Sequence, residues 1–364
     1  MRRLIHLVGL IAALSTAATT GAARADTLRI ATWDAALSRR GPGLLLQDIR
    51  RGKDPQIAAA VAVIAATRPD VLLITDIDYD ATGLALTALR ERLAAAGAPY
   101  PHAFARAPNT GVPTGLDLDG DGVATGPRDA QGYGWFPGQG GMAILSRLPI
   151  DAGSSRDLSA LLWRDLPGNL IAGAGLGAET QAVQRLSSSG HWDVVVITPS
   201  GPLHLLAYAA TPPVFDGPND RNGRRNRDET ALWLAYLDGR LPWPAPTGRF
   251  VILGDANLDP ADGEGRRDAL AALLADPRVQ DPKPTSKGAV AAASTGHRGD
   301  PALTTADWDE GKGPGNLRVD YLLPSAGLRV TAAGVYWPPP GDPGADAASG
   351  ASPHRLVWAD IALP

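Results

Sequence analysis

The chain has no cysteine among its 364 residues. This absence excludes disulfide bonds, thiolate metal ligands and a cysteine nucleophile. Stability must therefore come from packing, and from any metal that oxygen or nitrogen ligands hold.

A long apolar run is also absent. The run from Leu4 to Leu14 is shorter than the roughly 18 residues of a membrane-spanning helix, and no later stretch is long enough, so we expect no transmembrane segment. Arg2 and Arg3 precede this run and Ala23-Arg24-Ala25 follows it, which is the pattern of a cleaved signal peptide. We therefore interpret residues 1–25 as a signal peptide and expect a periplasmic or secreted protein. An uncleaved N-terminal anchor is the alternative.

An excess of positive charge is missing as well. Lys and Arg together number 34 against 38 Asp and Glu, and removing Arg2, Arg3 and Arg24 changes the formal net charge from −4 to −7. A protein that binds nucleic acid without sequence preference is normally basic, because neutralising phosphates dominates such binding. A polyphosphate substrate would therefore need a local basic patch, and the acidic balance favours a small substrate over long duplex DNA.

The first part of the chain predicts a strand, a helix and a second strand. An apolar strand over 27–33 ends at Asp34, a helix spans 55–67, and a buried strand over 71–75 is followed by Asp76. This β-α-β unit places an acidic residue at the end of each strand.

The rest of the chain alternates strands and helices. We expect helices over 84–96 and 227–237, and strands over 143–145, 192–198, 203–208 and 250–253, of which 192–198 and 203–208 form a hairpin. Such a mixture implies mixed sheets. We interpret 99–137 as a long functional loop and 338–352 as a solvated loop. Five tryptophans are expected to pack in the core or on a sheet face rather than to stack on bases: Trp163, Trp192, Trp233, Trp308 and Trp358.

The most specific motif is Gly254-Asp255-Ala256-Asn257, at the end of an apolar strand. Asp255 and Asn257 are two residues apart, so their side chains leave the strand end on the same side. One can orient a water molecule while the other donates to a phosphate. Taken alone, the motif fits a simple strand-ending turn equally well.

Together with its surroundings, this motif resembles the endonuclease/exonuclease/phosphatase superfamily, which includes deoxyribonuclease I, abasic-site endonucleases, inositol polyphosphate phosphatases and secreted sphingomyelinases. The resemblance covers essentially the whole chain after residue 25. It implies a four-layer α/β sandwich with two packed mixed β-sheets and helices outside, in a single domain over 26–364. The matching segments, in chain order, are 29–34, 69–76, 140–150, 254–257, 318–321 and 352–354.

The resemblance implies that Asp34 and Asp76 bind Mg²⁺ or Mn²⁺, which polarises the phosphoryl oxygen. The family places Asn at the first of these positions and Glu at the second. Both aspartates are oxygen donors for a hard cation, although Asp76 reaches about one methylene less far than Glu.

The catalytic groups follow from the same resemblance. Asp255 would orient or deprotonate the attacking water, and Asn257 would stabilise the developing charge. His354 would contact the scissile phosphate or transfer a proton, with Asp320 holding its imidazole in one tautomer. The Asp that usually precedes this His is replaced by Pro353, which removes a carboxylate that commonly helps to bind metal.

Tyr208 is a further candidate. Many nucleases of the family carry a His after the corresponding strand, and abasic-site enzymes carry a Tyr there. Tyr208 either fills this role or packs in the core.

Two other constellations each leave two interpretations open. The carboxylates of Asp117, Asp119 and Asp121 alternate as in the first half of an EF-hand Ca²⁺ loop, but the expected Glu at the twelfth position is Arg128, next to Asp129. An ordinary acidic loop fits as well.

Arg221, Arg224 and Arg225 lie just before a predicted helix and just after the strand of Tyr208. Arginine forks suit phosphate geometry, so this segment is a candidate phosphate-binding site. A solvated helix start, whose arginines pair with the acidic residues that follow, is the alternative.

We therefore expect an exported, metal-dependent phosphoesterase that hydrolyses a phosphodiester, such as nucleic acid or a lipid head group, with an activated water, and that acts as a monomer. A sugar- or inositol-phosphate phosphomonoesterase is the second hypothesis. The third is a catalytically degenerate protein that keeps the fold and binds a ligand or partner, because the fold alone does not choose among these functions.

Overall fold

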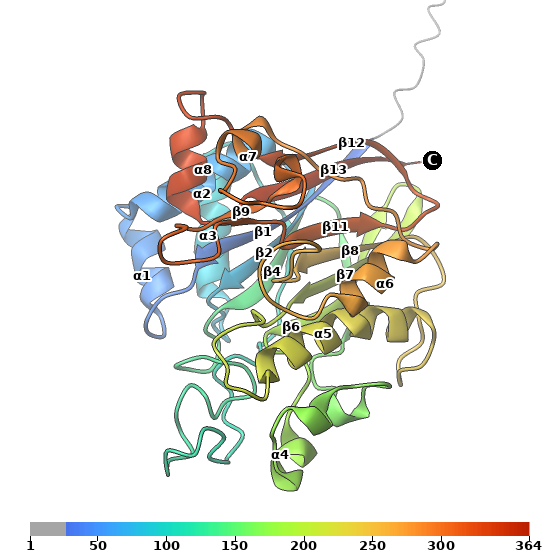
Figure 1. Cartoon of the computed structure of the whole chain (residues 1–364). Helices are drawn as coiled ribbons and strands as arrows, with labels where there is room; N and C mark the ends of the chain where they lie inside the picture. The colour runs from blue at the N-terminus through green and yellow to red at the C-terminus, as the bar shows by residue number, and fades with distance from the viewer. Residues whose placement is uncertain (1–26, 364) are drawn as a thin grey trace, which may run out of the picture.

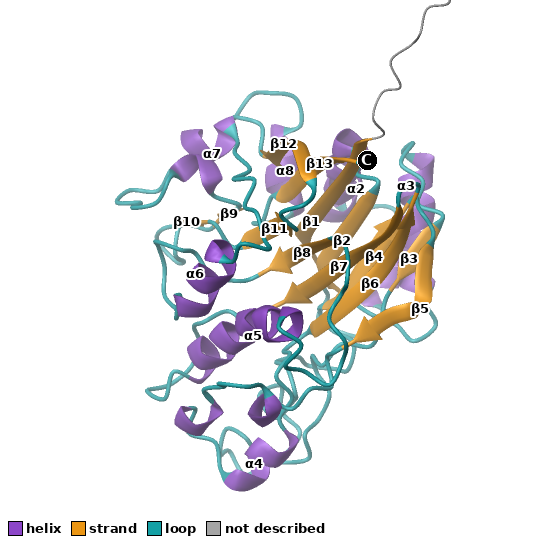
Figure 2. Ribbon diagram, turned by 90° about the vertical axis from the view of Figure 1, so that its right-hand side faces the viewer, coloured by secondary structure: helices purple, strands orange, loops and turns teal. Residues whose placement is uncertain are grey.

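The computed structural model describes residues 27–363, so the interpretation of residues 1–25 as a signal peptide lies outside the described part of the chain. Two β-sheets pack face to face and helices cover both outer faces (Figures 1 and 2). The expected four-layer α/β sandwich with two packed mixed β-sheets is confirmed. Within residues 27–363 no helix is both long and apolar enough to cross a membrane.

The first sheet has six strands in the order β12-β13-β1-β2-β4-β3. β1 and β2 are parallel, and the other neighbours in this sheet are antiparallel. The strands, in this spatial order, span Arg329–Tyr336, Leu356–Ala362, Thr27–Leu37, Val71–Ile77, Gly141–Ser146 and His102–Phe104. The C-terminal strand β13 therefore lies inside the sheet, between β12 and β1.

The second sheet has five strands in the order β11-β8-β7-β6-β5, with β7 and β8 parallel. These strands span Asp320–Pro324, Phe250–Asp255, Gly201–Ala209, Gly190–Thr198 and Ile150–Asp157. A small third sheet pairs β9 (Ala306–Asp307) with β10 (Asn316–Leu317).

The helices divide between the two outer faces (Figures 1 and 2). One apolar cluster joins the first sheet to the helices on its outer face, and another joins the second sheet to α5 and α6. Helices of the first sheet are α1 (Leu44–Arg51), α2 (Pro55–Thr67), α3 (Leu84–Ala95) and α8 (Ala345–Ala351). Those of the second sheet are α5 (Arg221–Leu237) and α6 (Asp268–Ala275), while α4 (Ala178–Val183) and α7 (Lys287–Ala291) lie in the connections.

Strand periodicity assigns each side chain to one face. On β1, Leu28 and Ile30 enter the core between the sheets, whereas Ala31 and Trp33 pack against the helices. Because successive side chains alternate, the inward stripe of β1 continues to Asp34. The apolar core between the sheets therefore gives way to a carboxylate at the end of a central strand.

The structure corrects the expectation of a solvated loop over 338–352. Residues 345–351 form α8, in which Ala345, Ala348 and Ala351 are buried. Their small side chains allow close packing on α2, which is itself rich in alanine. A Gly/Pro/Ala-rich composition was therefore a poor guide to solvation here.

The predictions for the helix over 55–67, the five tryptophans and the loop over 99–137 agree with the structure. The helix over 55–67 is found with the same bounds, and Trp163, Trp192 and Trp233 are fully buried, while Trp308 and Trp358 are half-buried. The predicted loop over 99–137 is irregular apart from the short strand β3.

Candidate active site

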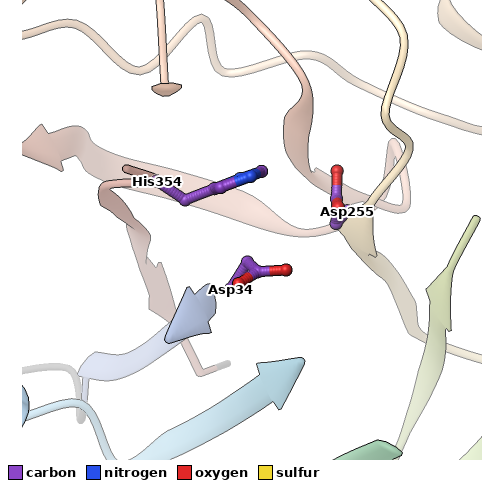
Figure 3. A group of neighbouring side chains, drawn as sticks. All are labelled: Asp34, Asp255 and His354. Atoms are coloured by element: carbon purple, nitrogen blue, oxygen red, sulfur yellow. The ribbon is translucent and has the colours of Figure 1, made fainter. Parts of the chain in front are cut away.

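Carboxylates from both sheets meet where the central strands end. Asp34 lies in β1 of the first sheet, and Asp255 is the last residue of β8 in the second. His354 lies just before β13, and Nε1 of Trp33 donates to its carbonyl oxygen at 3.1 Å. One ligand atom from each of Asp34, Asp255 and His354 lies within 4.8 Å of the others, and Figure 3 shows the three side chains converging. We call these three residues the central cluster.

Two side chains contact the imidazole of His354, and a third fixes its backbone. Its Nδ1 lies 3.0 Å and 3.2 Å from the two carboxylate oxygens of Asp320, the first residue of β11. Trp308 packs edge-to-face on the ring, with centroids 5.1 Å apart, and the backbone N–H of His354 donates to Oγ of Ser352. Because Nδ1 faces Asp320, Nε2 is the nitrogen available to a ligand.

The electrostatics of the cluster follow from its burial. Asp255 and His354 are almost fully buried, and Asp34 is half-buried. Burial raises the pKa of both Asp34 and Asp255. Burial acts to lower the pKa of His354, but Asp320 and Asp34 outweigh it and raise that pKa to about 10. An imidazolium therefore neutralises part of the acidic charge at neutral pH.

The cluster passes a simple test for a divalent cation. Two carboxylates and an imidazole converge within 4.8 Å. The two carboxylates favour a positive charge between them, and without a metal the protonated imidazole of His354 carries that charge. A cation can replace that proton, because metal ligation and protonation compete for the same nitrogen. The residues present therefore fit a metal ion.

Asp76 lies beside the central cluster and is not a member of it. The β1–β2 register breaks here, and Asp76 has φ 49°, a left-handed backbone conformation that redirects its side chain. Burial, followed by repulsion from Asp34 and Asp78, raises the pKa of Asp76 to about 7. The sequence paired Asp34 with Asp76 as metal ligands, whereas the structure groups Asp34 with Asp255 and His354.

Asn257 fixes Asp255. Its Nδ2 donates to Oδ2 of Asp255 at 2.5 Å and to the carbonyl oxygen of Ala210 at 2.9 Å, and its backbone N–H donates to Oδ1 of Asp255. Both amide hydrogens are thus used inside the protein. The structure therefore gives Asn257 a positioning role, in place of the direct contact with phosphate that the sequence led us to expect.

Tyr208 is not brought to the cluster. On β7, Leu205 and Ala207 face the core between the sheets, so Tyr208 points to the other face. Its ring packs against His191 and Trp233, with centroids 5.3 Å and 5.7 Å apart. Of the two interpretations left open by the sequence, the structure favours packing.

The three candidate arginines lie in the first two turns of α5, which begins at Arg221, six residues earlier than expected. Arg225 is buried, and its guanidinium donates to backbone carbonyl oxygens. Arg224 donates through Nε to the carbonyl oxygen of Asn219. The acceptors of Arg225 are the carbonyls of Gln131, Arg185, Leu186 and Ser187. The N–H groups of the Arg225 guanidinium are therefore used in hydrogen bonds to the backbone, and this arginine is not available to a phosphate.

Arg221 faces the acidic loop instead of the central cluster. Burial lowers its pKa, against the opposing effect of Asp129 and Asp119. In that loop Asp117, Asp119 and Asp129 bring one oxygen each within 4.8 Å of the others, while Asp121 accepts a hydrogen bond from the backbone of Val123. Asp129 thus takes the place that the EF-hand pattern gave to Asp121.

The carboxylates of this loop already have partners. Asp117 accepts from the backbone N–H groups of Gly120 and Gly122, and the buried Asp129 accepts from those of Leu118 and Gly126. Backbone donors of this kind stabilise an acidic loop without a cation. The geometry is therefore compatible with both a Ca²⁺ loop and an ordinary acidic loop.

Two buried polar residues of α5 support the site and were missed in the sequence. Asn226 donates through Nδ2 to the carbonyl oxygens of Thr211 and Ala256, and Glu229 accepts from the N–H of Thr211. These bonds fix the segments that follow β7 and β8. The signal was present as polar residues three apart, on a helix face that continues into the apolar Leu232 and Trp233.

Comparisons with known proteins identify the family and support the fold. The sequence profile of the Endonuclease/Exonuclease/phosphatase family matches residues 43–354. An endonuclease/exonuclease/phosphatase from Beutenbergia cavernae DSM 12333 has a similar structure, with a TM-score of 0.54, 20% identity and coverage of 93% of this chain and 72% of that chain. An endonuclease/exonuclease/phosphatase family protein from Leptotrichia buccalis C-1013-b is also similar, with a TM-score of 0.51, 14% identity and coverage of 92% of this chain and 100% of that chain. No match was found among the curated proteins.

Proposed function

The chain belongs to the endonuclease/exonuclease/phosphatase family, and from this premise we propose that it is an exported, monomeric, metal-dependent phosphoesterase that cleaves a phosphodiester with water. The observation that carries the proposal is the convergence of Asp34, Asp255 and His354 at the ends of the central strands, with Asp320 behind the imidazole. Carboxylates, an oriented histidine and a cation are the groups that phosphoester hydrolysis requires.

Each group has a role in this proposal. Asp34, Asp255 and His354 would hold the cation, which withdraws electron density from the phosphoryl oxygen when bound. Asp76 is the proposed general base in place of Asp255, because its carboxylate lies beside the central cluster and would not hold the cation. The water oxygen bonds to phosphorus, its proton passes to Asp76, and the ester oxygen leaves and takes a proton from solvent.

A small phosphodiester fits the charge of the site better than a phosphomonoester. A diester carries one negative charge and a monoester carries up to two, and both must approach several carboxylates. Of the three arginines expected to bind phosphate, Arg225 donates to backbone carbonyls and Arg221 faces the acidic loop. The phosphomonoesterase is therefore the second candidate.

A catalytically degenerate binding protein is the remaining candidate. It is favoured by Pro353, which stands where the family has an Asp, and by the ability of protonated His354 to neutralise the cluster without a metal.

The test is an assay of the chain without residues 1–25 on bis-p-nitrophenyl phosphate, p-nitrophenyl phosphate and plasmid DNA, with Mg²⁺, Mn²⁺, Ca²⁺ or EDTA. We expect turnover of the diester with a divalent metal and none with EDTA. Asp255→Ala should abolish turnover while the melting temperature shows that the protein still folds, and Asp117→Ala, in the acidic loop, is the matched control. Failure of every substrate with every metal would favour the binding protein.

Export is a separate part of the proposal and has its own test. Expression of the full chain in a Gram-negative host, followed by N-terminal sequencing of the periplasmic fraction, should find a protein that starts at Asp26. Retention of residues 1–25 on a membrane-bound protein would instead support the uncleaved anchor.

A further inference from the structure

Five exposed basic side chains gather around α1 without acidic partners. Within residues 27–363 none of the five makes an ion pair or a side-chain hydrogen bond. They are Arg40, Arg50, Arg51, Lys53 and Arg92, and we call them the basic face. The whole chain carries more acidic than basic residues, so this free positive charge is a local feature.

Arg92 joins the basic face from a different helix. It belongs to α3, which packs beside α1, and a Cβ atom built on Gly52 would lie 2.9 Å from Nη1 of Arg92. Gly52 ends α1 in a left-handed conformation with φ 65°. Arg92 therefore lies at the end of α1 that also carries Arg51 and Lys53. Figure 1 shows α1 at the left outer edge of the molecule.

The acidic residues near α1 do not neutralise the basic face. Asp48 and Asp54 both pair with Arg39, at 3.1 Å and 3.2 Å, and Asp54 also caps α2. Glu91 precedes Arg92 on α3, but the two side chains form no ion pair in the described part of the chain. An anion that approaches α1 therefore meets an excess of free positive charge.

Apolar side chains lie among these cations. Leu44 is 41% exposed, and a shallow depression on α1 is lined in part by Leu46, Arg50 and Arg51. The opposite side of the helix packs in the core. The outer side of α1 therefore combines arginine with leucine, a combination typical of segments that lie on a membrane interface.

We propose that the basic face docks the protein on a membrane surface rich in anionic phospholipid. Each Lys or Arg near such a surface strengthens binding by about fivefold, and an exposed leucine can enter the head-group region. Nucleic acid is a poorer match, because residues 38–54 contain no aromatic side chain that could stack on bases.

The basic face begins at the edge of the candidate site. The backbone N–H of Arg39, next to Arg40, donates to Asp78 at 2.9 Å. Asp78 is in turn close enough to Asp76 to raise the pKa of that carboxyl. A docked protein would therefore hold the central cluster near lipid head groups. Docking stands without the proposed function, and only a lipid phosphodiester as the substrate rests on it.

Co-sedimentation with vesicles measures docking. The protein is mixed, in EDTA to prevent hydrolysis, with vesicles of phosphatidylcholine alone or of phosphatidylcholine and phosphatidylglycerol in equal parts. We expect at least about 100-fold tighter binding to the vesicles that contain phosphatidylglycerol, and loss of this difference in about 0.5 M NaCl. Equal affinity for the two kinds of vesicle at low salt would overturn the proposal.

A triple variant tests the basic face itself. The changes are Arg50→Gln, Arg51→Gln and Lys53→Gln, and together they should weaken binding to the anionic vesicles by about 100-fold. The melting temperature is measured as well, because Arg50 and Arg51 also interact favourably with the C-terminus of α1. A lower melting temperature with unchanged vesicle binding would show that these residues only stabilise the helix, and would refute the docking role.

The matched control removes the same charge elsewhere. Its changes are Lys283→Gln, Lys287→Gln and Arg329→Gln, all at exposed positions outside the basic face. The control should weaken vesicle binding by less than about threefold. An equal loss in both triple variants would show that net charge alone governs binding, and would overturn the assignment to α1.

Leu44→Ser separates a membrane from a soluble polyanion. The change should weaken binding to the anionic vesicles by about threefold to tenfold, because less apolar surface is removed from water. It should leave binding to a single-stranded DNA oligonucleotide unchanged. Tighter binding to the oligonucleotide than to the vesicles, lost in the triple variant of the basic face, would make nucleic acid the partner and overturn the proposal.

A measurement on the unchanged sequence avoids any effect of substitution on folding. The chain has four lysines, all exposed, and only Lys53 belongs to the basic face. The others are Lys283, Lys287 and Lys312. At a lipid concentration about ten times the Kd, anionic vesicles should slow acetylation of Lys53 by about tenfold and leave the other three unchanged. Equal acetylation of all four lysines on the vesicles contradicts the proposal.

The outcomes separate this inference from the proposed function. A protein that docks on anionic vesicles through the basic face and hydrolyses none of the substrates supports the surface and overturns the enzyme. A protein that hydrolyses bis-p-nitrophenyl phosphate and binds both kinds of vesicle equally supports the enzyme and overturns the surface.

Discussion

At the scale of single residues, Asp320 sets the state of His354. Its carboxylate contacts Nδ1 and is the largest of the effects that raise the pKa of the imidazole. We predict that Asp320→Asn lowers kcat by about 10²-fold or more, because the imidazole loses its fixed tautomer, and changes KM little. Steady-state kinetics on the diester measure both parameters. Thr305→Val is the comparison variant, since the hydroxyl of Thr305 accepts from the backbone N–H groups of Val319 and Asp320, so its loss perturbs this segment without removing the Asp320 carboxylate.

A second prediction at this scale concerns His191. Burial lowers its pKa from 6.5 to about 3, and its two ring nitrogens are paired with Oγ of Ser187 and the carbonyl oxygen of Glu229. The unfolded chain therefore binds a proton between pH 6.5 and 3 that the native protein does not bind. The free energy of unfolding should fall as the pH decreases through this range, by up to about 5 kcal/mol from this residue.

Urea denaturation of the protein and of His191→Gln at several pH values measures this contribution. The variant should be less stable at pH 7 and should lose less stability on acidification. Parallel pH profiles for the two proteins would show that His191 does not titrate as described.

At the scale of elements, the first turns of α5 stabilise the fold through Arg225 and do not offer this arginine to a substrate. Arg225→Ala leaves buried carbonyl oxygens without donors, and we predict a loss of about 3 kcal/mol in the free energy of unfolding. KM for the diester should not change at temperatures where the variant is folded. Arg224→Ala is the control, with an expected loss of about 1 kcal/mol or less. A rise in KM with unchanged stability in Arg225→Ala would restore the phosphate-binding interpretation.

Elements with strong local signals could be predicted from the sequence. Pro55 begins α2, the side chain of Asp54 caps it, and Pro69 follows two residues after its end at Thr67, so both ends were predictable. The start of α5 was not, because Asp220 adopts a left-handed conformation and the polar residues that follow continue the helix. The helix propensity of these residues gives no information on the distant backbone carbonyls that accept hydrogen bonds from Arg225 and stabilise it in the first turns of α5.

Some residues of the candidate site could be predicted from the sequence, and others could not. Asp34 and Asp255 end apolar strands, and strand periodicity alone directs them inward. The outward direction of Tyr208 follows from the same periodicity, whereas the resemblance to the family suggested a place in the site. The use of both amide hydrogens of Asn257 depends on Ala210, a contact between distant segments that no local pattern shows.

At the scale of the whole molecule, the core between the sheets joins both halves of the chain. Residues from both sheets form one apolar cluster, so we predict a single cooperative unfolding transition, which would support the single domain that we expect over 26–364. Leu253→Ala should cost about 2 to 5 kcal/mol, because it opens a cavity in this shared core. Urea unfolding followed by tryptophan fluorescence and by far-UV circular dichroism should give coincident curves, and two separate transitions would indicate two units.

The position of β13 has a consequence for synthesis of the protein. The ribosome makes β13 after the other described strands of the first sheet, yet the sheet needs it between β12 and β1, and His354 lies just before it. A chain that stops between Asp255 and His354 therefore carries both carboxylates of the central cluster but lacks its histidine and the strand that separates β12 from β1. We expect such a fragment to form neither the complete first sheet nor the complete cluster.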